Sequence, residues 1–72
     1  MEQIEFGNRV KFFRINKLKV SQEDFAKTIG IDRTYLSKIE SGYKNPTLDT
    51  INKICDGLQI SINDFFNEKI DI

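Results

Sequence analysis

The chain has 72 residues, which is enough for one domain with a modest core. Its 11 basic and 11 acidic residues cancel, and 39% of its residues are hydrophobic, too many for a disordered chain. One cysteine and no histidine exclude an internal disulfide and leave no usable transition-metal ligand set. No apolar stretch is long enough for a membrane span or a signal peptide. We therefore expect one cytoplasmic domain over residues 1–72, with no metal, cofactor, membrane or small-molecule ligand.

The charges are unevenly distributed along the chain. Residues 1–44 contain nine basic and six acidic side chains, whereas residues 45–72 contain two basic and five acidic ones. A net charge of zero argues against a nucleic-acid partner. The uneven distribution, however, leaves residues 1–44 with an excess of positive charge, which is compatible with such a partner. Residues 9–19 carry five basic side chains and no acid. These side chains lie either on a solvated helix face or near phosphate, and the sequence leaves both open.

Apolar spacing and capping residues divide the chain into about five short helices. The first is marked by apolar residues at helical spacing, namely Phe6, Val10 and Phe13. Ser21 begins the second as its N-cap. Gly30 ends it, because glycine tolerates the left-handed backbone of a helix end. Ile31 is expected to follow as a buried plug.

The third helix is capped by Asp32 and runs to about Ser41, with Leu36 and Ile39 facing inward. The fourth is opened by the segment 45–47, since Pro46 suits the first helical position and either Asn45 or Thr47 can cap it. Its expected apolar stripe consists of Leu48, Ile51, Ile54, Cys55 and Leu58. A short fifth helix begins at Ser61 and contains Ile62, Phe65 and Phe66. No segment is typical of a strand.

The second and third helices, over about residues 21–41, form a helix-turn-helix, whose second helix enters the DNA major groove. The outward face of the third helix is free of acids and consists of Arg33, Thr34, Ser37 and Lys38. Arginine can donate twice to guanine, and threonine can bond to a base or touch a thymine methyl group. These four residues are our candidates for reading bases, although Lys38 suits a phosphate equally well.

The segment SQEDFAKTIGIDRTYLSKIESGYKNPTLDTINKI resembles the phage repressor and Cro type of helix-turn-helix protein. Within it, DRTYLSKIE is similar to the controller proteins of restriction-modification systems. The resemblance covers about residues 10–66 and implies an all-α, compact, five-helix fold like that of lambda repressor. It also implies contacts to the DNA backbone by Gln22, Tyr35, Tyr43, Lys44 and Asn45.

Several of these residues have a second interpretation. Gln22 could be a solvated helix residue, although a first-turn amide stands beside N–H groups that favour an anion. The ring of Tyr35 could pack on the core, contact phosphate through its hydroxyl, or do both. Family resemblance implies that Glu40 pairs with an arginine of the first helix. The spacing from Arg14 to Val20 is one residue longer than the family pattern, which leaves open whether Arg14 is that arginine.

The last residues contain more large apolar side chains than a small core can take. Ile62, Phe66 and Ile70 are therefore predicted to form a dimer interface within residues 60–72, together with Ile72, while Phe65 joins the core. The alternative is that Phe65 closes the core and the tail after residue 67 is frayed.

The function predicted from these features is that of a sequence-specific transcriptional regulator. We expect it to bind double-stranded DNA at a palindromic operator as a homodimer, as a restriction-modification controller protein. A phage-type repressor and an antitoxin that clamps a toxin are the alternatives. An enzyme is disfavoured, because the chain has no histidine, no glycine-rich phosphate loop and no paired carboxylates. Cys55 lies on an apolar stripe, which favours a core residue over a redox switch.

Overall fold

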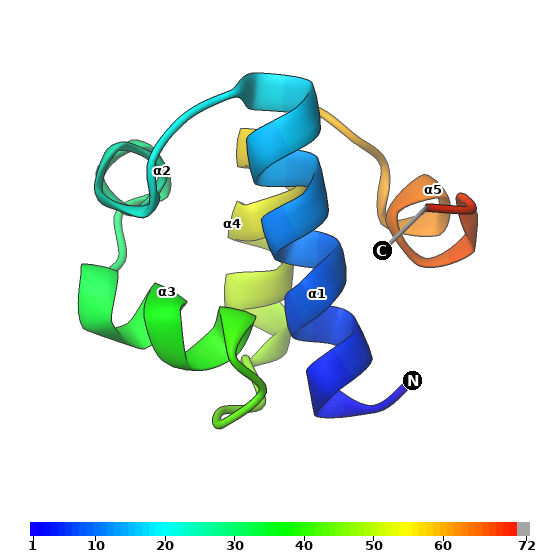
Figure 1. The fold of residues 1–72 in the computed structure, drawn as a ribbon, viewed down its shortest axis with the longest axis horizontal. Helices are drawn as coiled ribbons and strands as arrows, with labels where there is room; N and C mark the ends of the chain where they lie inside the picture. The colour runs from blue at the N-terminus through cyan, green and yellow to red at the C-terminus, as the bar shows by residue number, and fades with distance from the viewer. Residues whose placement is uncertain (71–72) are drawn as a thin grey trace.

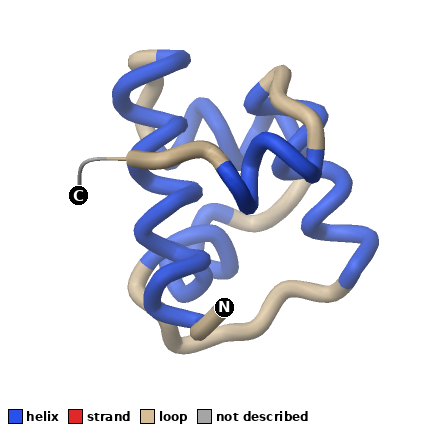
Figure 2. The backbone as a smooth tube through the Cα atoms, turned by 90° about the vertical axis from the view of Figure 1, so that its right-hand side faces the viewer, coloured by secondary structure: helices blue, strands red, loops and turns tan. Residues whose placement is uncertain are grey.

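The computed structural model describes residues 1–70, and every regular element in that range is helical. In chain order the elements are α1 (Gln3–Phe13), the π-helical turn η1 (Arg14–Leu18), α2 (Gln22–Ile29), α3 (Arg33–Glu40), α4 (Leu48–Leu58) and α5 (Ile62–Asn67). Figure 1 shows α1 in the middle of the molecule, with α2 and α3 on one side and α5 on the other. Helices joined by short loops make up the described chain (Figure 2). The predicted all-α fold with five α-helices is confirmed.

Side-chain caps begin four of the helices, because each supplies an acceptor for an N–H group that has no partner within the helix. Ser21 and Ser61 accept from the third residue of α2 and α5, at 3.1 and 3.0 Å. Asp32 caps α3 as predicted. For α4, Thr47 is the cap, one of the two residues predicted for that role, but Pro46 lies before the helix and not in its first position as predicted. The Thr47 hydroxyl accepts from a first-turn N–H at 3.2 Å, a bond that a start at Pro46 would forgo.

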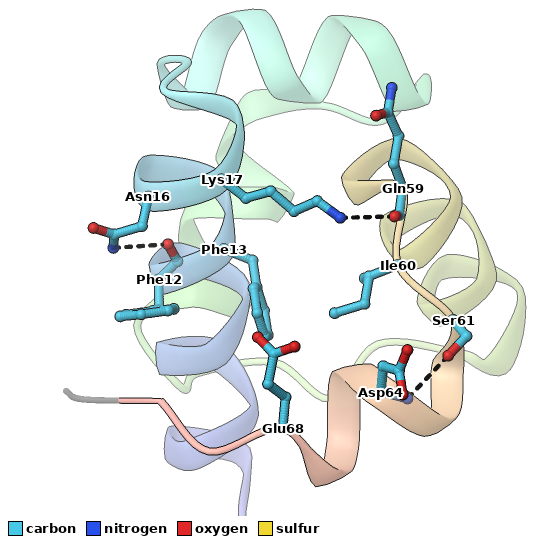
Figure 3. A pocket seen from close by; sticks show the side chains of 9 residues that line it. All are labelled: Phe12, Phe13, Asn16, Lys17, Gln59, Ile60, Ser61, Asp64 and Glu68. Atoms are coloured by element: carbon cyan, nitrogen blue, oxygen red, sulfur yellow. Dashed lines mark hydrogen bonds between the residues drawn. The ribbon is translucent and has the colours of Figure 1, made fainter.

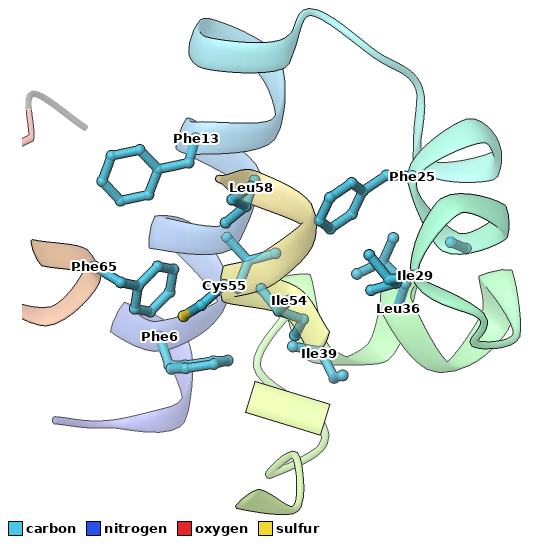
Figure 4. Packing of buried hydrophobic residues seen from close by; sticks show 12 residues of the cluster. Phe6, Phe13, Phe25, Ile29, Leu36, Ile39, Ile54, Cys55, Leu58 and Phe65 are labelled. Carbon is cyan, nitrogen blue, oxygen red and sulfur yellow. The ribbon is translucent and has the colours of Figure 1, made fainter. Parts of the chain in front are cut away.

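The core collects apolar side chains from all five α-helices (Figure 4). Its buried members are Phe6, Val10, Phe13, Phe25, Ala26, Ile29, Leu36, Ile39, Ile54, Cys55, Leu58 and Phe65. Two expectations are wrong. Leu48 is 72% exposed, because it is the first residue of α4 and the first buried position of that helix is Thr50. Ile31 is only half-buried, since it lies in the turn and packs against the edge of the core.

Cys55 lies in this core, and the environment suppresses its reactivity. Its side chain is buried. Desolvation, and to a smaller extent the negative charge of the neighbouring Asp56, raises the pKa of the thiol to about 11. The thiol therefore stays protonated at neutral pH, and thiolate is the nucleophilic form. This supports the interpretation of Cys55 as a small core residue.

Phe66 and Ile70, two of the predicted interface residues, have contacts within the chain. Phe66 lies with its ring centroid 6.0 Å from Phe6 and 5.1 Å from Phe65, and Ile70 packs partly against the core. The expectation that these two side chains find no packing partner within the chain is wrong. α5 packs against α1, where the Phe6 ring contacts Phe66 as well as Phe65. Ile62 remains 42% exposed. Ile72 lies outside the described residues.

α1 and α3 approach so closely that no side chain fits between them. A Cβ atom on Gly7 would collide with the carbonyl oxygen of Ile39 and lie 2.7 Å from that of Glu40. One turn earlier, the Gln3 amide donates to the Gly42 carbonyl at 3.0 Å. The end of α3 is therefore held against α1 by the close backbone approach at Gly7 and by the Gln3 side-chain bond.

Gly7→Ala is expected to destabilise the protein by about 2–3 kcal/mol, because the added methyl group meets backbone that has little room to move. The sign of the change in unfolding free energy distinguishes a crowded from an uncrowded position, because alanine in an uncrowded helix stabilises by about 1 kcal/mol relative to glycine. Urea unfolding followed by circular dichroism measures the change. Gly30→Ala is the control, with open space but a left-handed φ of +76°, and should cost about 1 kcal/mol. A Gly7→Ala protein as stable as the wild type would contradict the close approach.

Candidate nucleic-acid interface

The outward face of α3 presents the four residues predicted to read bases. α3 buries Leu36, Ile39 and Glu40, so the opposite side faces solvent. Arg33, Thr34, Ser37 and Lys38 are all exposed there. The nearest acid is Asp32, whose carboxylate accepts from the Thr34 N–H at 3.0 Å and is thus engaged as the helix cap. The face therefore carries hydrogen-bonding and basic groups without an opposing acid.

The loop between α3 and α4 folds back beside this face. The backbone N–H groups of Tyr43 and Lys44 both donate to the Lys38 carbonyl, at 2.9 and 3.3 Å. As a result the loop and the helix share one shallow hollow of about 530 Å³, lined by Thr34, Ser37, Lys38, Ser41, Tyr43 and Lys44. The Tyr43 side chain is 83% exposed at its edge. Five of the nine predicted DNA contacts thus lie together.

The other predicted contacts lie outside that hollow. Arg33 is exposed in the first turn of α3, and Asn45 lines a second hollow with the first residues of the chain. Tyr35 is half-buried and its ring packs against the core, while contact of its hydroxyl with phosphate stays a prediction. Gln22 is the first residue of α2, and its amide donates to Glu40 at 2.9 Å. A carboxamide has two N–H bonds, so one remains that could bind a phosphate. Contact of Gln22 with phosphate therefore stays a prediction.

A buried ion pair connects η1, at the end of α1, to α3. Arg14 and Glu40 are only 6% and 5% exposed. The guanidinium donates a hydrogen bond to each carboxylate oxygen, at 2.7 and 2.9 Å. The remaining terminal nitrogen of Arg14 donates to the Val20 carbonyl at 2.7 Å. Arg14 is therefore the partner of Glu40, which answers the question that the sequence left open.

The segment between Arg14 and Val20, whose spacing is longer than the family resemblance leads us to expect, contains the π-helical turn η1. Lys19 follows η1 with a left-handed φ of 58°, and the Val20 N–H returns to the Arg14 carbonyl at 3.4 Å. Such single π-helical turns occur within or at the end of α-helices. The turn follows α1 directly, and Arg14 at its start still pairs with Glu40.

The basic side chains of residues 9–19 do not act together as one solvated face or one phosphate-binding strip, because several of them donate hydrogen bonds within the chain. Arg9 donates to the carbonyls of Phe65 and Glu68 at 2.9 and 2.7 Å, and Lys17 donates to that of Gln59 at 2.8 Å. Arginine and lysine commonly bind such carbonyls at helix ends. Sequence reasoning missed these roles, because the partners lie more than 40 residues away along the chain.

Among residues 1–70, no group of three or more histidine, cysteine, aspartate or glutamate side chains could hold a metal ion. None of the helices formed by these residues has the length and apolar character that a membrane crossing requires.

Comparison with known proteins places this surface in context. The helix-turn-helix family profile matches residues 10–65. The control protein C.MunI of Mycoplasma sp is 44% identical over 66 residues, which cover 92% of this chain and 89% of that protein. The restriction-modification controller protein C.AhdI of Aeromonas hydrophila superposes with a TM-score of 0.84 at 34% identity, covering 89% of this chain and 96% of that one. The C.Esp1396I tetramer bound to its natural 35 base-pair operator gives 0.80 at 34% identity, covering 89% and 83%.

Glu40→Gln is expected to destabilise the protein by about 3 kcal/mol, because it leaves the buried Arg14 charge without its counter-ion. Urea denaturation monitored by circular dichroism gives the value. Asp49→Asn serves as the matched control, since the Asp49 carboxylate pairs with Lys53 at 3.3 Å on the surface and should contribute less than about 0.5 kcal/mol. Equal stability of the two variants would show that the buried pair does not hold α3 in place.

Proposed function

The chain belongs to the helix-turn-helix family, and from this premise we propose that it is a DNA-binding transcription regulator, the controller protein of a restriction-modification system. The observation that carries the proposal is the acid-free outward face of α3, which adjoins the exposed loop residues Tyr43 and Lys44. The similarity to control proteins favours this function over a phage-type repressor or an antitoxin. No enzymatic activity is proposed.

In the proposed complex, α3 lies in the major groove and α2 crosses the backbone. Arg33 would donate to a guanine, while Thr34, Ser37 and Lys38 read the neighbouring bases. Tyr43, Lys44 and Asn45 would contact phosphates from the loop, together with Gln22 and Tyr35. Contacts to phosphate hold the protein in register, and contacts to base edges select the sequence.

We propose that the protein acts as a homodimer on a palindromic operator. One recognition helix reads too few bases to select a single genomic site, whereas a twofold dimer places two helices in successive grooves, about 34 Å apart. Ile62 is 42% exposed on α5, next to the half-buried Phe66 and Ile70. C.Esp1396I is a tetramer on its own operator, which supports assembly of several copies on DNA.

Arg33→Ala and Lys44→Ala should weaken DNA binding in different ways. Arg33→Ala is expected to cost about 1–3 kcal/mol on the operator and little on random DNA, because a bidentate base contact carries discrimination. Lys44→Ala should weaken both complexes and lower the slope of log K against log salt by about 1, since one phosphate contact is lost. Mobility-shift titrations on both DNAs over a salt series provide the measurement. Equal loss on both DNAs for Arg33→Ala would assign Arg33 to phosphate.

Ile62→Asp is expected to raise the dimer dissociation constant at least about tenfold, because a charge at a symmetric contact is buried twice. Ile62 suits this test better than Phe66, whose ring packs within the chain. Sedimentation equilibrium measures the dissociation constant, and circular dichroism verifies folding. Leu48→Asp is the matched control, an exposed apolar residue at the start of α4. If Ile62→Asp dimerises like the wild type, the interface lies elsewhere.

A further inference from the structure

α1 and η1 form one continuous segment that is tied near each end to a carbonyl group in a loop between helices. Near its end, Lys17 donates to the Gln59 carbonyl between α4 and α5, at 2.8 Å (Figure 3). At its beginning, the Gln3 amide donates to the Gly42 carbonyl between α3 and α4, at 3.0 Å. The second bond reaches the loop that carries the proposed phosphate contacts, so it bears on DNA binding.

The first turn of α1 also packs directly on Gly42. A Cβ atom on this glycine would lie 2.7 Å from Cγ1 of Ile4 and 3.1 Å from its Cα. The left-handed φ of +85° at Gly42 turns the chain away from the end of α3. α1 therefore meets the loop at the residue that precedes Tyr43, and the Gln3 bond fixes the two segments at that point.

The loop is also held by α3, from which it departs. The Gly42 N–H donates to the Ile39 carbonyl at 3.1 Å, and the N–H groups of Tyr43 and Lys44 donate to the Lys38 carbonyl. These bonds place the backbone, whereas the side chains of Tyr43 and Lys44 are exposed. Where the two side chains stand relative to α3 thus depends on how firmly the loop backbone is held.

We propose that Gln3 is a positioning residue for DNA binding, which holds the loop between α3 and α4 where Tyr43 and Lys44 meet the phosphate backbone. The proposal rests on the DNA-binding function proposed above and adds α1 to the elements that shape the interface. Gln3 acts through the loop rather than on DNA, because its amide donates to Gly42 and the exposed Glu2 lines the same hollow, of about 580 Å³. A carboxylate at this place repels a phosphate.

Gln3→Met tests this role, because it removes the donor and keeps the length of the side chain. The affinity for operator and for random DNA should fall by a similar factor, about three- to tenfold, since one hydrogen bond is lost and phosphate contacts are independent of sequence. In a Tyr43→Ala/Lys44→Ala background the same substitution should cost less than about twofold, because the contacts through which Gln3 acts are gone. Mobility-shift titrations of the four proteins give these ratios.

Amide hydrogen exchange of the free protein, followed by NMR, tests the loop without DNA. Gln3→Met should speed exchange of the Tyr43 and Lys44 N–H groups about three- to tenfold, because the loop opens more often. Exchange of the Ile31 N–H, in the turn between α2 and α3, should not change. Lys17→Met is the matched control, since it removes the corresponding bond near the other end of the segment, and it should leave the Tyr43 and Lys44 rates unchanged.

The contrary outcomes are distinguishable. DNA binding by Gln3→Met as tight as that of the wild type overturns the positioning role. A loss that persists in the Tyr43→Ala/Lys44→Ala background also overturns it, since Gln3 would then contact DNA itself. Equal acceleration of Ile31 exchange overturns it too, because the substitution would then destabilise the whole fold. A wild-type protein that binds neither DNA overturns the proposed function, while the exchange rates still show whether Gln3 holds the loop.

Discussion

The arrangement of the proposed DNA-binding surface depends on the buried pair between Arg14 and Glu40. Both carboxylate oxygens accept from the guanidinium, and one of them also accepts from Gln22. The third arginine nitrogen is satisfied by the Val20 carbonyl. Burying two charges is costly unless such partners are complete. Because they are complete here, one cluster joins the end of α1, the entry to α2 and the end of α3, and it holds Gln22 at the place where a phosphate contact is proposed.

α1 connects this cluster to the opposite side of the molecule. One of its faces contacts the end of α3 through Gly7, where no side chain fits, and through the Gln3 amide. The other face contacts α5 through Phe6, and Arg9 donates to two carbonyls at the end of that helix. The proposed dimer face and the recognition helix are therefore attached to the same rigid helix. In a dimer, the distance between the two recognition helices would follow from these packing contacts rather than from any flexible segment.

Features set by local chemistry were accessible from the sequence. Caps such as Ser21 and the left-handed Gly30 mark helix ends through contacts of a few residues, and helical periodicity orients the outward side of α3. Features set by distant contacts were not. The exposure of Leu48 depends on where α4 meets the core, and the inward bond of Arg9 depends on a carbonyl 56 residues away. The unexpected spacing before Val20 was visible in the sequence, but a longer loop and a π-helical turn have the same spacing, so the sequence could not distinguish them.

The zero net charge constrains how this surface could bind DNA. Arg9, Arg14 and Lys17 donate to groups inside the protein, so the face around α3 relies on Arg33, Lys38 and Lys44. Affinity from phosphate neutralisation grows with the number of cations in contact. With few such cations in each copy, non-specific binding would be weak, and base contacts would supply a larger share of the binding free energy. Joining two copies through the acidic side of the molecule would double those base contacts while keeping Asp64 and Glu68 away from the phosphates, which is why a neutral chain of this polarity suits a dimeric regulator.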